Sequence, residues 1–206
     1  MNELRHGGGL HEEPSRFLPG VYYFRKGNEA LHKGDVAGAI ELWKISAGWA
    51  MKDAQYNLGI VYFEGQGVPV DEPLGLAWLA LAAERKNAAF NDSLTAAWSQ
   101  TEPSVHDRAN AVWRELRLRY DDEHALPAAR QRFESELAQQ TGSRVGMPGH
   151  MVVSTADGNF DVATFRQQLL DQSQLNFGNL PRATVDVGTL QPIGDGMSGS
   201  GDQPVQ

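Results

Sequence analysis

Three of the five tryptophans in this chain recur at a single interval, because Trp43, Trp78 and Trp113 are separated by 35 residues each time (43 to 78, then 78 to 113). Each tryptophan lies among apolar residues at helical spacing, as Trp78 does between Leu74 and Ala82. A period in the mid-thirties is typical of stacked helical hairpins, each of which buries its apolar face only against its neighbours. The interval therefore predicts a helical repeat array, a class of fold that usually binds other proteins.

The apolar pattern, interrupted by glycine and proline, divides this array into three hairpins. The predicted helices span residues 21–33 and 36–47, residues 53–63 and 72–85, and residues 88–99 and 104–120. A further helix at 127–140 is expected to cap the array, as the ends of such arrays require. The predicted fold is all-α: a short right-handed solenoid of about three helical hairpins (an α/α superhelix) with a capping helix and a partly disordered C-terminal extension.

The composition suggests four regions along the chain. Residues 1–20 are expected to form a flexible leader, 21–141 the helical repeat domain, 142–193 a partly ordered extension and 194–206 a disordered tail. The extension lacks lysine and glutamate. Within it, apolar spacing predicts a helix at residues 161–170, and alternation predicts a short strand at residues 184–190.

Charge and composition exclude several classes of function. The net charge is -8, with 26 acidic and 18 basic residues, so binding to nucleic acid is not expected. The absence of cysteine excludes disulfides, thiolate metal sites and a cysteine nucleophile. The chain has neither a signal-peptide pattern nor an apolar run of the roughly 20 residues that a membrane span needs. We therefore expect no direct insertion into a membrane. The expected location is the cytoplasm as the sequence is written, and the alternative is the periplasm if the N-terminus is trimmed or misassigned.

Fragments that imitate catalytic or ligand motifs lack their required context. Residues 6–9 (HGGG) resemble an oxyanion loop, but no G-x-S-x-G follows. Residues 194–199 match G-x-G-x-x-G without a preceding strand, and residues 157–168 lack the glycine and glutamate of a calcium loop. Residues 121–124 (DDEH) are interpreted as a polar turn between helices. The sequence therefore predicts no catalytic residue, no metal site and no cofactor.

Two segments resemble known repeat families. Residues 26–43 resemble a tetratricopeptide repeat, through a glycine at the helix crossing, a Gly-Asp turn, and an alanine followed four residues later by an aromatic side chain. Residues 54–83 are similar to the related Sel-one-like repeat, whose motif appears here as Ala54-Gln55-Tyr56-Asn57-Leu58-Gly59, Gly65-Gln66-Gly67-Val68 and Trp78 followed by Ala82-Ala83. The third unit keeps Ala89 and Trp113 but loses the glycine loop, and the resemblance covers roughly residues 21–120.

The resemblance implies a groove for a partner. In tetratricopeptide-type arrays the first helix of each hairpin lines the concave face. The corresponding positions in this chain are Asn28, Leu31 and His32 in the first unit and Tyr56, Ile60, Phe63 and Glu64 in the second. Phe24 stands where some relatives carry a lysine that grips a carboxylate. An aromatic and aliphatic groove instead suits an extended or helical apolar peptide.

The sequence therefore predicts a noncatalytic protein–protein interaction module (an adaptor, scaffold or assembly factor) that binds a partner protein or peptide through its concave helical groove. The alternative is a structural or self-associating subunit, and so a homo-oligomer, whose C-terminal extension packs in its own or a neighbour's groove. The side chains that would then cover the groove are those of Phe160, Phe165, Leu169 and Phe177. The resemblance implies bacterial regulatory, envelope or secretion contexts as well as eukaryotic quality control.

Overall fold

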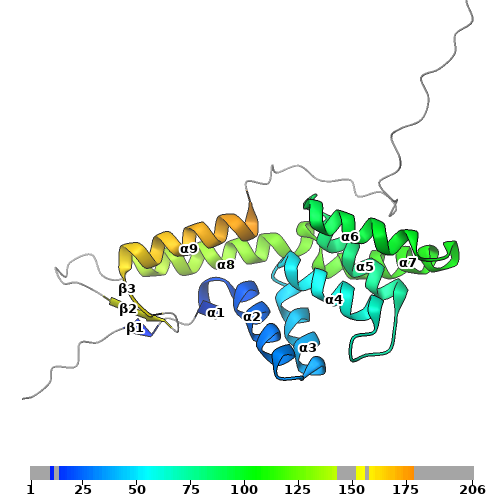
Figure 1. The fold of residues 1–206 in the computed structure, drawn as a ribbon. Coiled ribbons are helices and arrows are strands. Elements are labelled where there is room, and N and C mark those ends of the chain that lie inside the picture. The colour runs from blue at the N-terminus through cyan, green and yellow to red at the C-terminus, as the bar shows by residue number, and fades with distance from the viewer. Residues whose placement is uncertain (1–9, 12–13, 143–151, 156–157, 179–206) are drawn as a thin grey trace, which may run out of the picture.

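The structure is a computed structural model that describes residues 10–11, 14–142, 152–155 and 158–178. Its central part consists of three successive helix pairs, which we call hairpins by their order along the chain (Figure 1). Their helices are α2 (Pro19–His32) and α3 (Val36–Ala47), α4 (Lys52–Glu64) and α5 (Glu72–Ala83), and α6 (Ala88–Ser99) and α7 (Pro103–Tyr120). The helices of the first two pairs pack closely on each other, whereas the second helix of the third pair packs mainly against the second helix of the second pair. The prediction of an all-α helical solenoid is confirmed, and the helix bounds differ from the predicted ones by at most two residues.

Side-chain caps begin one helix in each hairpin. The Asp35 carboxylate accepts a hydrogen bond from the Gly38 amide at 2.8 Å, and Asp71 accepts one from the Leu74 amide at 3.1 Å. Asn87 caps α6 in the same way, through the amides of Ala89 and Phe90. Such caps satisfy backbone amides that the first turn of a helix leaves without partners, so they define where α3, α5 and α6 start.

The three periodic tryptophans lie in one buried core. Trp43, Trp78 and Trp113 are each at most 5% exposed and belong to the same apolar cluster, which also contains Leu58 and Tyr120. The rings of Trp78 and Tyr120 meet edge to face, with 4.7 Å between their centroids. The 35-residue interval thus reflects one aromatic side chain from the second helix of each hairpin, as the sequence predicted.

The helix after the third hairpin, α8 (Asp122–Gly142), begins five residues earlier than predicted. It starts there because the Asp121 carboxylate accepts a hydrogen bond from the His124 amide at 2.9 Å, so the polar turn is the first turn of the helix. Figure 1 shows α8 running back from the third hairpin towards α1 (Pro14–Phe17). Phe133 of α8 packs against Phe17 and Leu18. Ala125 and Leu126, nearer the start of α8, pack against Ala50 in the turn before α4.

A second cluster joins the two ends of the described chain. It combines Phe17 and Leu18 with Phe133 of α8 and with Phe165 and Leu169 of α9 (Val162–Phe177). Phe17 and Phe165 meet edge to face at 5.9 Å. The structured region thus begins before the boundary expected at residue 20, because Phe17 and Leu18 are buried.

Three short strands also connect the ends. β1 (Leu10–His11) pairs in parallel with β2 (Val152–Thr155), which pairs antiparallel with β3 (Gly158–Asp161). The sequence analysis predicted none of these strands. The helix expected at residues 161–170 is present and continues to Phe177. The predicted strand at 184–190 and tail at 194–206 lie outside the described residues.

Candidate functional site

The second hairpin places one predicted groove residue against the third. Tyr56 of α4 stacks on Phe90 of α6, with 4.9 Å between ring centroids and 21° between planes. The Tyr56 hydroxyl lies 3.2 Å from the Ser93 hydroxyl, also on α6. Both rings are only half-buried. Two successive repeat units therefore present one shared aromatic surface.

Two other predicted groove residues contribute to packing between hairpins. Ile60 and Phe63 are half-buried and pack against a cluster that includes Leu79 of α5, Trp98 of α6 and Val105 of α7. Part of their apolar surface is therefore used to hold the second and third hairpins together. The remainder lies on the same side of α4 as Tyr56.

Asn28 links the first two hairpins. Its side-chain oxygen accepts hydrogen bonds from the indole nitrogen of Trp43 at 3.0 Å and from the amide nitrogen of Asn57 at 3.3 Å. The residue therefore has a structural role, although its half-buried side chain still reaches the surface. The last three predicted residues are exposed and lie toward the helix ends: Leu31 and His32 on α2, and Glu64 on α4.

The sequence analysis missed Phe90 and the neighbouring Asn91. A signal for them is present, because Ala-x-aromatic-Asn occurs at residues 54–57 and again at residues 88–91. The third unit lacks the glycine loop that identified the second, and the shorter motif was not matched. We refer to the sides of α2, α4 and α6 that carry Asn28, Tyr56 and Phe90 as the first-helix face.

A pocket of about 270 Å³ adjoins this face. It lies between the start of α4, the connection from α5 to α6 and the last turn of α9. Phe90 belongs both to the pocket and to the aromatic stack, so the two features are continuous. The lining residues are Lys52, Asp53, Ala82, Arg85, Asn87, Phe90, Leu175 and Asn176.

The inner end of the pocket is a buried ionic network around Lys52, which is 5% exposed. Its ammonium group lies 2.6 Å from a carboxylate oxygen of Glu84 and 3.2 Å from one of Asp122. It also donates hydrogen bonds to the Leu81 carbonyl at 3.0 Å and to the Gln55 side chain at 3.2 Å. The charge is therefore fully coordinated, as a buried ammonium group requires.

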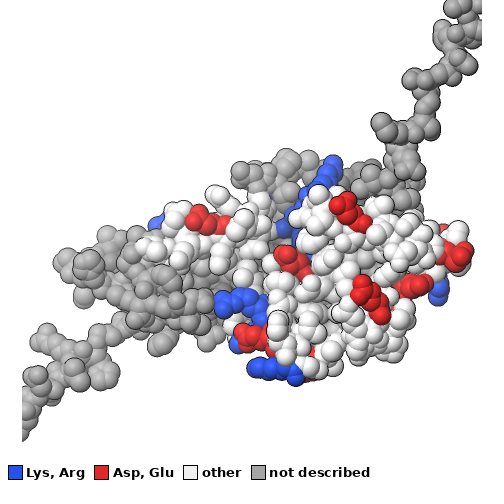
Figure 2. Space-filling model, viewed as in Figure 1, with Lys and Arg blue, Asp and Glu red and all other residues white. Residues whose placement is uncertain are grey.

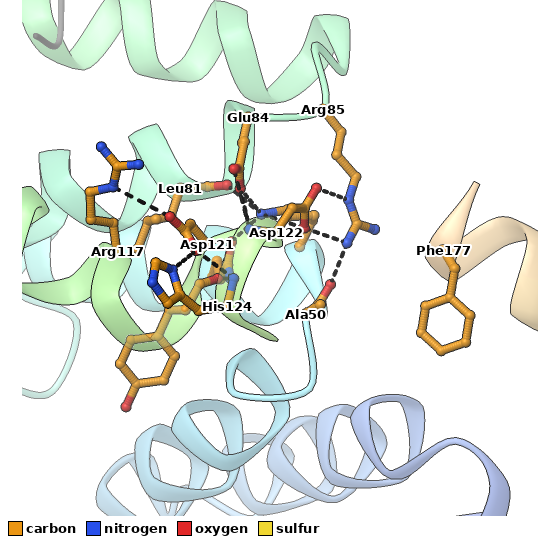
Figure 3. A network of polar contacts seen from close by, with 12 residues as sticks. Ala50, Leu81, Glu84, Arg85, Arg117, Asp121, Asp122, His124 and Phe177 are labelled. Atoms are coloured by element: carbon orange, nitrogen blue, oxygen red, sulfur yellow. Dashed lines mark hydrogen bonds and ion pairs between the residues drawn. The ribbon is translucent and has the colours of Figure 1, made fainter. Parts of the chain in front are cut away.

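Arg85 extends the network to three other parts of the chain. Its guanidinium pairs with the Asp122 carboxylate through two hydrogen bonds of 2.7 and 2.6 Å. It also donates to the Ala50 carbonyl at 3.0 Å, and Figure 3 shows it between these two groups. A further hydrogen bond reaches the Asn176 carbonyl at the end of α9. One side chain thus joins the second hairpin, the start of α8, the turn before α4 and the C-terminal helix.

The two carboxyl groups of this network respond oppositely to their surroundings. Burial raises the pKa of Glu84 above its usual value, and the Asp122 carboxylate adds to this rise against the opposing charge of Lys52. Burial alone would also raise the pKa of Asp122, but hydrogen bonds from Arg85 and the charge of Lys52 hold it below its usual value. Asp122 is therefore the more firmly ionised partner of the two cations.

The carboxylate and imidazole ligand atoms of Asp121, Glu123 and His124 lie within 4.8 Å of one another. Local structure accounts for this grouping. Asp121 caps α8 and contacts the His124 imidazole at 2.6 Å, and Arg117 lies 3.3 Å from the other Asp121 oxygen and 3.6 Å from Glu123. We therefore interpret the group as a helix cap with paired charges.

The sequence analysis proposed that the C-terminal extension could pack in the groove of the repeats. The described part of the extension instead covers a surface formed by α1 and α8. Phe165 and Leu169 pack against α1 and α8, not against Tyr56, Ile60 or Phe63. The neighbour that partly covers Tyr56 is Phe90 of the third hairpin. Phe160 lies in β3, and its side chain is outside the described part. No helix among the described residues is long and apolar enough for a membrane span.

Comparison with known proteins identifies one repeat. Residues 52–87 match the family model of the Sel1 repeat, which is the Sel-one-like repeat named above. No curated protein matches the chain. A solved structure that it resembles is a protective antigen present in uropathogenic Escherichia coli strains, which displays an SLR fold. The sequence identity is 20% and the TM-score is 0.45. The match covers 63% of this chain and 27% of the antigen, so this chain spans about a quarter of the antigen's length.

Proposed function

Since this chain carries a Sel1 repeat within a tetratricopeptide-like helical array, we propose that it is a noncatalytic adaptor or scaffold that binds a segment of a partner protein across the first-helix face. Sel1 repeats are generally protein-interaction modules. The partner segment is expected to lie over the aromatic stack and to enter the adjoining pocket.

The observation that carries this proposal is the half-buried stack of Tyr56 on Phe90 beside an open pocket. Aromatic side chains offer large contact areas at a low cost in conformational entropy, and they dominate the binding energy of many interfaces. Asn57 and Asn91 directly follow Tyr56 and Phe90 in the sequence, and both asparagines are half-buried. Such groups can exchange hydrogen bonds with the backbone of a bound peptide.

The paired charges around the pocket have a structural role. The buried ion pairs of Lys52 and Arg85 with Glu84 and Asp122 join three parts of the chain: the start of α4, the end of α5 and the start of α8. Groups held in this way stabilise the arrangement of the segments that they join. On the face drawn in Figure 2, acidic and basic side chains are interspersed, which does not suit a polyanionic partner such as nucleic acid.

The proposal is tested by affinity capture from native extract, followed by mass spectrometry. The baits are the full chain, a Tyr56→Ala/Phe90→Ala variant and a Leu118→Ala control, in which the changed side chain is 68% exposed on α7. We expect the full chain and the Leu118→Ala control to capture the same partner protein in equal amounts. The double variant should recover it at least about tenfold less, since aromatic anchors contribute 2 kcal/mol or more.

Circular dichroism and thermal melting of each bait establish that the double variant is folded. Equal recovery of every protein by all three folded baits would exclude the first-helix face as the binding surface.

A further inference from the structure

We propose that the pocket is built for a lysine or arginine side chain of the partner segment, and that the C-terminal helix α9 supplies one of its walls. This inference rests on the proposed function and adds the chemistry of the residue that the partner inserts. It follows from the charge, the shape and the composite construction of the pocket.

The charge of the pocket is set by Asp53. The inner network contains two cations, Lys52 and Arg85, and two anions, Glu84 and Asp122, in direct contact, so it is neutral as a unit. Asp53, which is exposed, makes no ion pair with any of the described residues. Among the residues that the structure describes, the Asp53 carboxylate is thus the one charge at the pocket without an opposite partner.

The helix ends that border the pocket do not cancel this charge. The N-terminal ends of α4 and α6 and the C-terminal ends of α5 and α9 meet there. Each helix end corresponds to roughly half an elementary charge, positive at the N-terminus and negative at the C-terminus, so the two pairs of ends contribute about zero net charge. The full negative charge of Asp53 remains, and the pocket therefore favours a cation.

The walls suit a side chain with an apolar stem. Phe90 and Ala82 line the repeat side of the pocket, and Leu175 lines the α9 side although it is 86% exposed. Lysine and arginine pack their methylene groups on such surfaces and keep the charged end in water. A cation near the Phe90 ring would gain further attraction from the ring face. A volume of about 270 Å³ lies just below the roughly 300–1,000 Å³ of small-molecule sites, which fits one long side chain better than a whole ligand.

Two arginines fix the α9 wall in place. The backbone carbonyls of Asn176 and Phe177 accept hydrogen bonds from Arg85 and Arg130, respectively. Both carbonyls belong to the last turn of α9, where cationic side chains favour the helix dipole. Leu175 is therefore held beside Phe90, and the site requires both the repeat domain and the extension.

The first part of the test titrates the full-length ¹⁵N-labelled chain with N-acetyl-arginine amide and with its uncharged isostere, N-acetyl-citrulline amide. We expect saturable shifts of the Asp53, Phe90 and Leu175 amides in the millimolar range with the arginine compound. The natural chain should bind the citrulline compound about three- to fivefold more weakly than the arginine compound. Asp53→Asn should bind the arginine compound more weakly than the natural chain by the same factor, which is the size expected for a partly exposed ion pair. Asp92→Asn, an exposed aspartate of α6 outside the pocket, serves as the matched control and should bind as the natural sequence does. Equal binding of both compounds, or shifts that do not localise to these residues, would overturn the proposal.

The second part separates this proposal from the proposed function. Asp53→Asn and Asp92→Asn are added as baits to the capture experiment. Recovery that falls with Asp53→Asn and not with Asp92→Asn supports the cation pocket. Recovery that falls with Tyr56→Ala/Phe90→Ala but not with Asp53→Asn overturns the cation pocket and leaves the first-helix face as the binding surface.

Discussion

Gly59 and Gly75 set the distance between the two helices of the second hairpin. A Cβ atom on Gly59 would lie 2.7 Å from the Leu79 side chain. A Cβ atom on Gly75 would lie 2.6 Å from the backbone nitrogen of Phe63. Both distances are shorter than real carbon contacts, so a side chain at either position separates the helices. The backbone contact at Gly75 is the more severe of the two, since the backbone of α4 cannot rotate away.

We expect Gly75→Ala to destabilise the protein by about 1–3 kcal/mol or more, because overpacking forces α4 and α5 apart. Urea unfolding followed by circular dichroism measures the change. Gly48→Ala is the control, because Gly48 ends α3 in an ordinary helical conformation; its effect should stay below about 1 kcal/mol. A Gly75→Ala protein as stable as the control would show that α5 can move without cost.

The sequence predicted one of these two glycines. Gly59 belongs to the Leu-Gly pair of the Sel-one-like motif, and the structure confirms its close approach to α5. Gly75 falls in an apolar helical segment and contacts a residue twelve positions earlier, which only the hairpin geometry brings near. The burial of Lys52 was missed for a similar reason, because its four partners come from three separate segments.

At the scale of elements, local periodicity located helices but not their distant partners. The spacing of Val162, Phe165 and Leu169 correctly predicted a helix in the extension. The surface that this helix covers involves Phe17 and Phe133, which are far away in the sequence, and no pattern within α9 specifies them. The same limit explains why the small sheet, which pairs residues 10–11 with residues 153–154, was not predicted.

We expect truncation after Gly142 to increase the fluorescence of a dye that binds apolar surface. The truncation removes α9 and thereby uncovers Phe17 and Phe133, which are at most 6% exposed in the full chain. Leu175→Ala, which changes an exposed residue of α9, should leave dye binding unchanged. Equal dye binding by the truncated and full chains would mean that another part of the chain covers this cluster.

At the scale of the whole molecule, the Lys52 network connects segments that the repeat pattern alone leaves independent. It joins the second hairpin to the start of α8, to Ala50 before α4 and to the end of α9. Gln55 adds a hydrogen bond of 2.6 Å to the Tyr120 carbonyl at the end of the third hairpin. The network therefore makes the stability of the assembled molecule depend on the ionisation of its carboxyl groups.

We expect Glu84→Gln to remove a decline in stability as the pH rises from the ordinary glutamate pKa of about 4 through the raised pKa of Glu84. Since the pKa of Glu84 is raised in the folded protein, its contribution is fully present below the ordinary pKa of a glutamate and is lost as the pH rises through the raised value. Asp122, with its lowered pKa, acts in the opposite direction: its contribution is present above the ordinary pKa of an aspartate and is lost in more acidic solution.

Urea unfolding across this pH range measures the difference between the natural chain and the variant, with Glu134→Gln, an exposed glutamate of α8, studied alongside. The interpretation of Glu84 would be wrong if the stability of the natural chain rose relative to Glu84→Gln as the pH increased.

The cluster that joins the two ends of the described chain also has a consequence for the order in which its parts fold during synthesis. Arg16 binds Glu136, which lies 120 residues later, whereas the first two hairpins close between neighbouring helices. At a synthesis rate of about 5–20 residues per second, roughly 6–24 s separate the appearance of these two residues. The repeat array can therefore fold first. Until α8 and α9 are synthesised, Phe17 lacks Phe133 and Phe165 as packing partners on the nascent protein. For those seconds the exposed Phe17 ring is apolar surface of the kind that makes folding intermediates prone to aggregate.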